Sequence, residues 1–165
     1  MDNSIYRVRW NTLVKITTVI VSIILLFVEW EVVNSLIHSN NILLCVILLS
    51  VINFMIIITI LNVPLYLKLT EDAIILKKIG GSIKIEYNEI QFIQTHNAYP
   101  DMRLFGSGGF FGYIGIFSND KQGWYNSYVE NPKQSFLITT NKNKKYVFSS
   151  ENREDIINKV KQQIK

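Results

Sequence analysis

The chain has 165 residues and a formal net charge of +4 at pH 7, from 17 Lys and Arg against 13 Asp and Glu. This length suits one small domain with a short additional segment. The mild basic excess is not the clustered Lys/Arg face that nucleic-acid binding requires, so no nucleic-acid partner is expected. Cys45 is the only cysteine, which excludes an intramolecular disulfide.

Residues 11–30 are expected to form a first membrane-spanning helix. The stretch between Lys15 and Glu29 is uncharged, and Trp10 and Trp30 lie about 30 Å apart on a helix, as interfacial anchors at the two faces of a bilayer would. The Lys15 side chain can extend outward to the membrane surface. A secretory signal peptide is the alternative interpretation, but no small-residue cleavage pattern follows the apolar stretch.

Residues 42–62 give the stronger signal for a second span. The chain has no Asp, Glu, Lys or Arg between Val32 and Leu67, and the sequence ILLCVILLSVINFMIIITIL is apolar over the length that a helix needs to cross about 30 Å of hydrocarbon. We therefore expect residues 1–63 to be a two-helix anchor in the cell membrane, with the bilayer as its first partner.

Basic residues flank both spans but are absent from the connection between them. They are Arg7, Arg9 and Lys15 before the first span and Lys68, Lys77, Lys78 and Lys84 after the second. The positive-inside rule then places both termini in the cytoplasm.

Residues 64–165 are expected to form a cytoplasmic, mainly-β domain. Pro64 ends the second helix, and the apolar period then changes to two. Short strands follow at spacings of about ten residues, which is typical of an antiparallel barrel or sandwich. A C-terminal amphipathic helix is predicted from one apolar stripe, formed by Ile156, Ile157, Val160 and Ile164.

The most distinctive local sequence is the glycine-rich block RLFGSGGFFGYIG at residues 103–115. It lacks the Gly-Lys-Ser/Thr of a phosphate-binding loop, and Phe111 stands where a dinucleotide-binding pattern needs glycine. We interpret the block as a bulged strand that approaches another backbone closely, with structural roles for Gly108, Gly109 and Gly112.

This block, with the later Gly-Trp-Tyr, FLITT and KYVFSSENRE segments, resembles the bacterial pleckstrin-homology (PH) domain family found behind two transmembrane helices. The resemblance runs from about Pro64 to the C-terminus. It implies a membrane helical hairpin followed by a PH-like barrel of about seven antiparallel strands, closed by one C-terminal helix. It implies no agreed ligand or activity.

Catalytic chemistry is not expected. His38 and His96 lie in different regions, so no paired His supports a metal site. Ser107 lies in Gly-Ser-Gly, which is not the Gly-x-Ser-x-Gly of a nucleophile elbow. No cofactor is predicted, and the oligomeric state is left open.

The predicted function is a membrane-anchored interaction module that recruits or regulates a protein partner at the cytoplasmic face. Its candidate partner surface consists of the aromatic residues Phe110, Phe111, Trp124 and Tyr125, unless these pack inward. The alternative is a domain that binds a lipid headgroup or a small ligand through Lys77 and Lys78, beside Gly80-Gly81.

Overall fold

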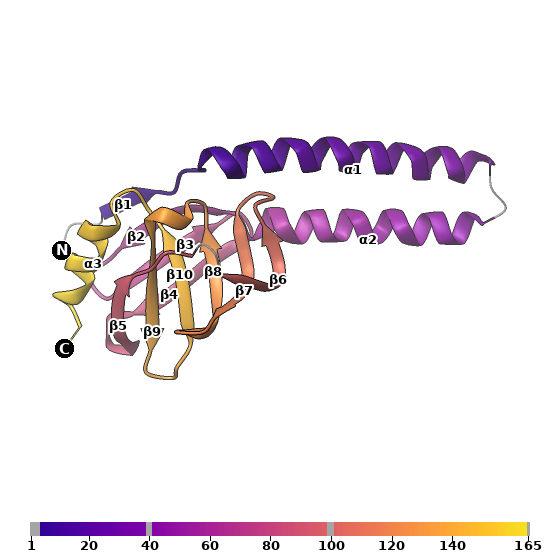
Figure 1. Cartoon of the computed structure of the whole chain (residues 1–165). Coiled ribbons are helices and arrows are strands. Elements are labelled where there is room, and N and C mark those ends of the chain that lie inside the picture. Colours follow the sequence, from indigo (N-terminus) through magenta and orange to yellow (C-terminus); the bar gives the residue numbers. More distant parts are fainter. Residues whose placement is uncertain (1–3, 39–40, 99–100, 165) are drawn as a thin grey trace.

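The computed structural model describes residues 4–38, 41–98 and 101–164, and it divides into a helical hairpin and a β domain (Figure 1). The helices α1 (Thr12–His38) and α2 (Ile42–Leu61) project side by side from one end of the β domain. Both are long and apolar enough to be candidate membrane spans, and little of either is buried. The first helix extends eight residues beyond the expected end at Trp30, because residues 31–38 contain no Pro or Gly that would end it.

The first strand of the β domain precedes the helices. Strand β1 (Ser4–Arg7) pairs antiparallel with β2 (Pro64–Leu69), and β3 (Ala73–Lys78) and β4 (Gly81–Glu86) complete a four-stranded sheet. The predicted division at residue 63 assigned this N-terminal segment to the anchor, whereas the structure places Ser4–Arg7 in the β domain. Both described ends of the chain therefore lie together at the end remote from the hairpin (Figure 1).

The second sheet has six strands in the order β5-β9-β10-β8-β7-β6. They are β5 (Ile90–Thr95), β6 (Met102–Gly108), β7 (Tyr113–Asn119), β8 (Gly123–Val129), β9 (Ser135–Thr140) and β10 (Lys145–Ser149). The 3-10 turns η1 (Tyr87–Glu89) and η2 (Pro132–Gln134) precede β5 and β9.

The prediction of about seven antiparallel strands in a barrel is corrected in three respects. The described residues form ten strands, they form two sheets that do not close on each other, and β8 pairs with β10 in parallel. Two of the additional strands come from the segment before the helices and from the glycine-rich block, which forms most of β6. The parallel pair arises because the β9–β10 hairpin lies with β10, not β9, beside β8.

The main core lies between the two sheets and under α3 (Arg153–Lys161). The predicted apolar stripe of this helix is confirmed, since Ile156, Ile157 and Val160 are buried in that core. A second, smaller core lies on the other face of the six-stranded sheet and consists of Ala98, Phe117, Tyr125, Val129, Leu137 and Val147.

Candidate functional sites

The junction between α1 and the β6–β7 turn fixes the hairpin to the β domain. Asn11 caps α1 by accepting a hydrogen bond from Val14 N at 2.7 Å, and Asn11 N donates to the carbonyl of Glu130 at 3.3 Å. Thr18 Oγ1 accepts a hydrogen bond from Phe111 N at 2.9 Å, and both Val14 and Thr18 are buried. The first turns of α1 therefore belong to the β domain, and only the later turns are free to enter a membrane.

The glycine-rich block makes this junction possible. Gly109 has φ +127° and lies so close to α1 that a Cβ would be 3.2 Å from Thr17 Cγ2. Gly106 and Gly115 are paired across β6 and β7, and a Cβ on either would lie within about 2.2 Å of the carbonyl oxygen of the opposite strand. The structural interpretation of the block is confirmed for Gly109 and for Gly112, which has φ +126°. It is wrong for Gly108, whose φ is not positive and where an added Cβ would meet only the Arg103 side chain, at 3.1 Å.

Glu130 lies under the same junction and is completely buried. Neither of its carboxylate oxygens has a hydrogen-bond partner among the described residues, and a Cβ on Gly112 would be 3.1 Å from Glu130 Oε1. Burial raises the pKa of the Glu130 carboxyl to about 8. The side chain is therefore protonated in the folded protein at neutral pH, and sequence inspection missed it because Glu130 stands in no motif.

The two lysines predicted to bind a ligand do not form one site. Neighbouring residues on a strand point to opposite faces, so Lys77 and Lys78 diverge. Lys78 Nζ donates a hydrogen bond to Asn62 Oδ1 at 2.7 Å and lies 5.0 Å from the ring centre of Tyr128. Partial burial lowers the pKa of Lys78. In the described structure Lys78 thus ties β3 to the end of α2.

The four predicted partner-surface aromatics also separate. Phe110 and Phe111 are half-buried, and Phe111 packs edge-on against Trp10 with a centroid distance of 5.7 Å. Tyr125 is buried in the second core and offers no surface to a partner. Only Trp124, at the start of β8, is widely exposed, with 74% of its surface accessible.

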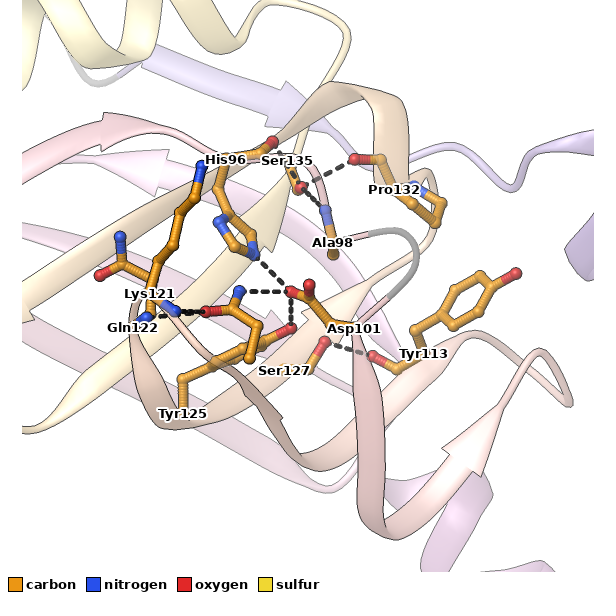
Figure 2. A network of polar contacts seen from close by, with 11 residues as sticks. His96, Ala98, Asp101, Tyr113, Lys121, Gln122, Tyr125, Ser127, Pro132 and Ser135 are labelled. Carbon is orange, nitrogen blue, oxygen red and sulfur yellow. Dashed lines mark hydrogen bonds and ion pairs between the residues drawn. The ribbon is translucent and has the colours of Figure 1, made fainter.

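A polar network centred on Asp101 connects the end of β5, the start of β6, the end of β7 and the first residues of β8 (Figure 2). Asp101 Oδ2 accepts hydrogen bonds from His96 Nε2 at 2.9 Å, from Asn119 Nδ2 at 3.0 Å and from the Tyr125 hydroxyl. Burial and the adjacent carboxylate raise the pKa of Tyr125. Ser135 Oγ donates to the carbonyl of His96 and not to its ring, so no hydroxyl or thiol nucleophile among the described residues is paired with this imidazole.

A cleft of about 430 Å³ opens where the edge of β4 faces the β9–β10 turn. Its basic lining residues are Lys84, Lys142 and Lys144, and Glu89 is the acidic one. Lys84 Nζ is already bonded to Asp72 Oδ2 at 2.8 Å, which raises the pKa of Lys84. Lys142 and Lys144 are close in the sequence, but their meeting with Lys84 depends on how the sheets pack.

Within the described ranges, no three His, Cys, Asp or Glu side chains are grouped so that they could hold a metal ion. The sites consist instead of a rigid junction, a buried polar network and open surfaces on a small two-sheet domain.

The family model of the bacterial PH domain matches residues 65–164, which is more than half of the chain. The chain therefore belongs to the bacterial PH domain family, with two apolar candidate spans before the matched region. PH-like domains are generally non-catalytic interaction modules. No curated protein and no solved structure matches the chain.

Proposed function

We propose that this protein is a membrane-anchored PH-like interaction module that holds a protein partner at the cytoplasmic side of the membrane, without catalysis. Its hairpin exposes apolar side chains along both helices, which suits lipid, and the junction with α1 mounts the β domain rigidly on the hairpin. The Tyr6 hydroxyl donates a hydrogen bond to Asp155 Oδ2 at 2.6 Å, which supports a topology with both termini on one side.

The observation that carries the proposal of a protein partner is the position of two carboxylates in the hairpin. Glu29 lies nine residues before the end of α1 at His38, and Val51 lies nine residues after the start of α2 at Ile42. Because the helices run antiparallel with equal rise, Glu29 is level with the middle of α2, and Glu31 lies one half-turn nearer the connection.

These carboxylates have no compensating charge on the neighbouring helix. α2 contains no Lys or Arg, and neither Glu29 nor Glu31 has an ion-pair or hydrogen-bond partner among the described residues. An acidic side chain at the middle of a bilayer costs about 2.5–3.5 kcal/mol on insertion scales. A membrane-spanning helix of another protein that carries Lys or Arg would offset this cost.

Copurification from native membranes tests the proposal. Tagged full-length protein, extracted in mild detergent after crosslinking, should retain a stoichiometric membrane protein, and the double variant Glu29→Gln with Glu31→Gln should lose it. Asp120→Asn is the matched control, because Asp120 is an exposed acid in the β7–β8 turn. Wild-type protein that migrates without any stoichiometric partner would overturn the proposal.

The lysine cleft supports a second candidate function, the binding of an anionic small ligand. Lys142 and Lys144 are exposed, and together with Lys84 they give the cleft an excess of positive charge over Glu89. Titration with inorganic pyrophosphate, followed by chemical shifts of the cleft residues, tests this candidate. Saturable binding that Lys142→Gln and Lys144→Gln abolish would favour it.

A further inference from the structure

Strand β6 is an edge strand with unusually exposed apolar side chains. It lies at the end of the six-stranded sheet, and among the described strands it pairs with β7 alone. Met102, Leu104 and Phe105 have 62%, 41% and 64% of their surfaces accessible. In Figure 1 this strand is the part of the sheet nearest to the helical hairpin.

The residues of α1 and α2 beside β6 show how far along the helical hairpin this strand lies. A cleft of about 390 Å³ is lined by Thr17 and Val21 of α1, by Met55 and Ile58 of α2, and by Phe105 on β6. A second cleft, of about 130 Å³, brings the neighbouring residues Gly106 and Ser107 against the last turn of α2. The β6–β7 hairpin therefore lies alongside the domain-proximal turns of both helices, not below their ends.

The length of α2 sets the depth at which β6 lies relative to a bilayer. Its 20 residues extend about 30 Å, which equals the thickness of a typical hydrocarbon core. Met55 lies six residues before the end of α2 at Leu61, or about 9 Å along the helix axis. The strand β6 lies beside this last 9 Å of α2 and beside Asn62, which follows the helix, so it is placed at the end of the span, where the hydrocarbon gives way to the headgroups.

We propose that β6 and the β6–β7 turn lie in the interfacial layer of the bilayer, with Leu104 and Phe105 as the lipid-contacting side chains. The two residues adjoin the β-bulge between Arg103 and Phe105, which interrupts the alternation of faces along the strand. This inference rests on the membrane anchorage in the proposed function. The N–H and C=O groups on the outer edge of β6 have no strand partner, so β6 cannot lie in the hydrocarbon itself. In the interfacial layer, water and lipid headgroups can form hydrogen bonds with these groups. The aromatic cluster of Trp10, Phe110 and Phe111 lies at the same turn, and aromatic rings favour this layer.

Trp124 belongs to a different surface. It lies two strands away from β6, about 10 Å farther along the sheet, and it lines neither of the clefts beside the helices. Contact of β6 with the bilayer interface therefore fixes how far the β domain lies from the membrane, while the surface around Trp124 stays in water.

Single-cysteine labelling of the full chain in proteoliposomes tests the interfacial placement of β6. In a Cys45→Ala background, Phe105→Cys and Leu104→Cys are each labelled with the environment-sensitive fluorophore NBD, and Lys142→Cys in the exposed β9–β10 turn is the control. At residues 104 and 105 we expect a blue-shifted emission, quenching by spin-labelled lipid, and at least about fivefold weaker quenching by iodide than at residue 142.

Carbonate extraction of the same proteoliposomes separates the interfacial placement from the anchor. Protein that resists extraction but carries an iodide-accessible label at residue 105 would overturn the interfacial placement and leave the anchor intact. Extraction of the protein would instead overturn the anchor. A label that is shielded from iodide but not quenched by the spin-labelled lipid would assign β6 to a protein contact and would also overturn the interfacial placement.

Discussion

The two ends of the β domain are closed in different ways. At the end remote from the helices, α3 covers the main core with an ordinary apolar stripe that includes Ile156 and Val160. At the end that carries the hairpin, the first turns of α1 cover the β6–β7 turn through the contacts of Thr18 with Gly109 and Phe111. The α3 end is covered by packed apolar side chains. The hairpin end depends on contacts between α1 and the backbone of the β6–β7 turn, which require glycine there.

This difference determines what each end tolerates. An apolar stripe accepts substitutions of similar volume, because packing can readjust around a side chain. Backbone contacts at glycine accept no side chain, because the atoms that would collide are carbonyl groups of a paired strand. The end that mounts the domain on the hairpin is therefore the more brittle one.

The largest effect is expected at the glycine pair. Gly115→Ala places a Cβ at about 2.2 Å from the Phe105 carbonyl oxygen and at φ +133°, so we expect a loss of more than about 4 kcal/mol in the free energy of unfolding. Thermal melting of the full chain in detergent measures it. Gly81→Ala is the matched control, since φ is +145° there but no atom lies within 4 Å. Equal losses in the two variants would show that φ strain, and not the collision, sets the effect.

A second prediction concerns pH and Glu130. The folded protein holds this proton up to a pKa of about 8, while the unfolded chain releases it near 4.5. The unfolded state therefore binds fewer protons between these values, and stability falls by about 1.4 kcal/mol per pH unit as the pH rises through this range. Over the whole range the loss is on the order of 5 kcal/mol.

Glu130→Gln should remove this dependence because the amide does not titrate. Melting temperatures of wild type and variant between pH 5 and pH 8 measure it, with the exposed Glu89→Gln as the control for an ordinary carboxylate. Parallel curves for wild type and Glu130→Gln would contradict the assignment of the buried proton to this residue.

The sequence predicted the helix-remote end better than the hairpin-side end, for a physical reason. Helical and strand periods reveal which side chains share a face, and they identified α2, α3 and the strands from Leu65 onward other than β6. The glycine block was also interpretable, since glycines interleaved with aromatics indicate close approach. The period could not show that Ser4–Arg7 returns to pair with β2, because that pairing joins segments separated by the whole hairpin.

The surroundings of a candidate site residue could be predicted only where they depend on its neighbours in the sequence. Adjacent Lys77 and Lys78 looked like one basic site, but strand alternation separates them, and Lys78 is engaged by Asn62. Tyr125 was grouped with Trp124 as a surface aromatic, although alternation on the same strand points the two rings to opposite faces. Glu130 and Asp101 acquire their environments from distant strands, which no local pattern reports.

The Asp101 network is expected to lock the free end of the β6–β7–β8 region. Asp101→Asn weakens three hydrogen bonds to a buried carboxylate, and we expect a loss of about 2 kcal/mol in the free energy of unfolding. Denaturant unfolding measures it, with the exposed Asp120→Asn as the control. If the two variants unfold at the same denaturant concentration, the network contributes nothing to stability.

The smallest expected effect lies at the α3 end, where Tyr6 joins β1 to α3. Its hydroxyl donates to Asp155 Oδ2 at 2.6 Å and accepts from Lys159 Nζ at 2.8 Å. Tyr6→Phe keeps the buried ring and removes these bonds, so a loss of about 1 kcal/mol is expected.

The Tyr6 prediction has a pH signature that separates it from a packing defect. Hydrogen bonds from Tyr6 and Lys159 lower the pKa of Asp155, so this carboxylate stabilises the fold above its ordinary pKa of 3.8 and loses that contribution as the pH falls through the lowered value. Tyr6→Phe should therefore unfold earlier than wild type at pH 7 and approach it at pH 2–3. Tyr66→Phe is the control, because the Tyr66 hydroxyl has no hydrogen-bond partner among the described residues. A deficit of the same size at both pH values would mean that the ring packing, and not the bond to Asp155, had been disturbed.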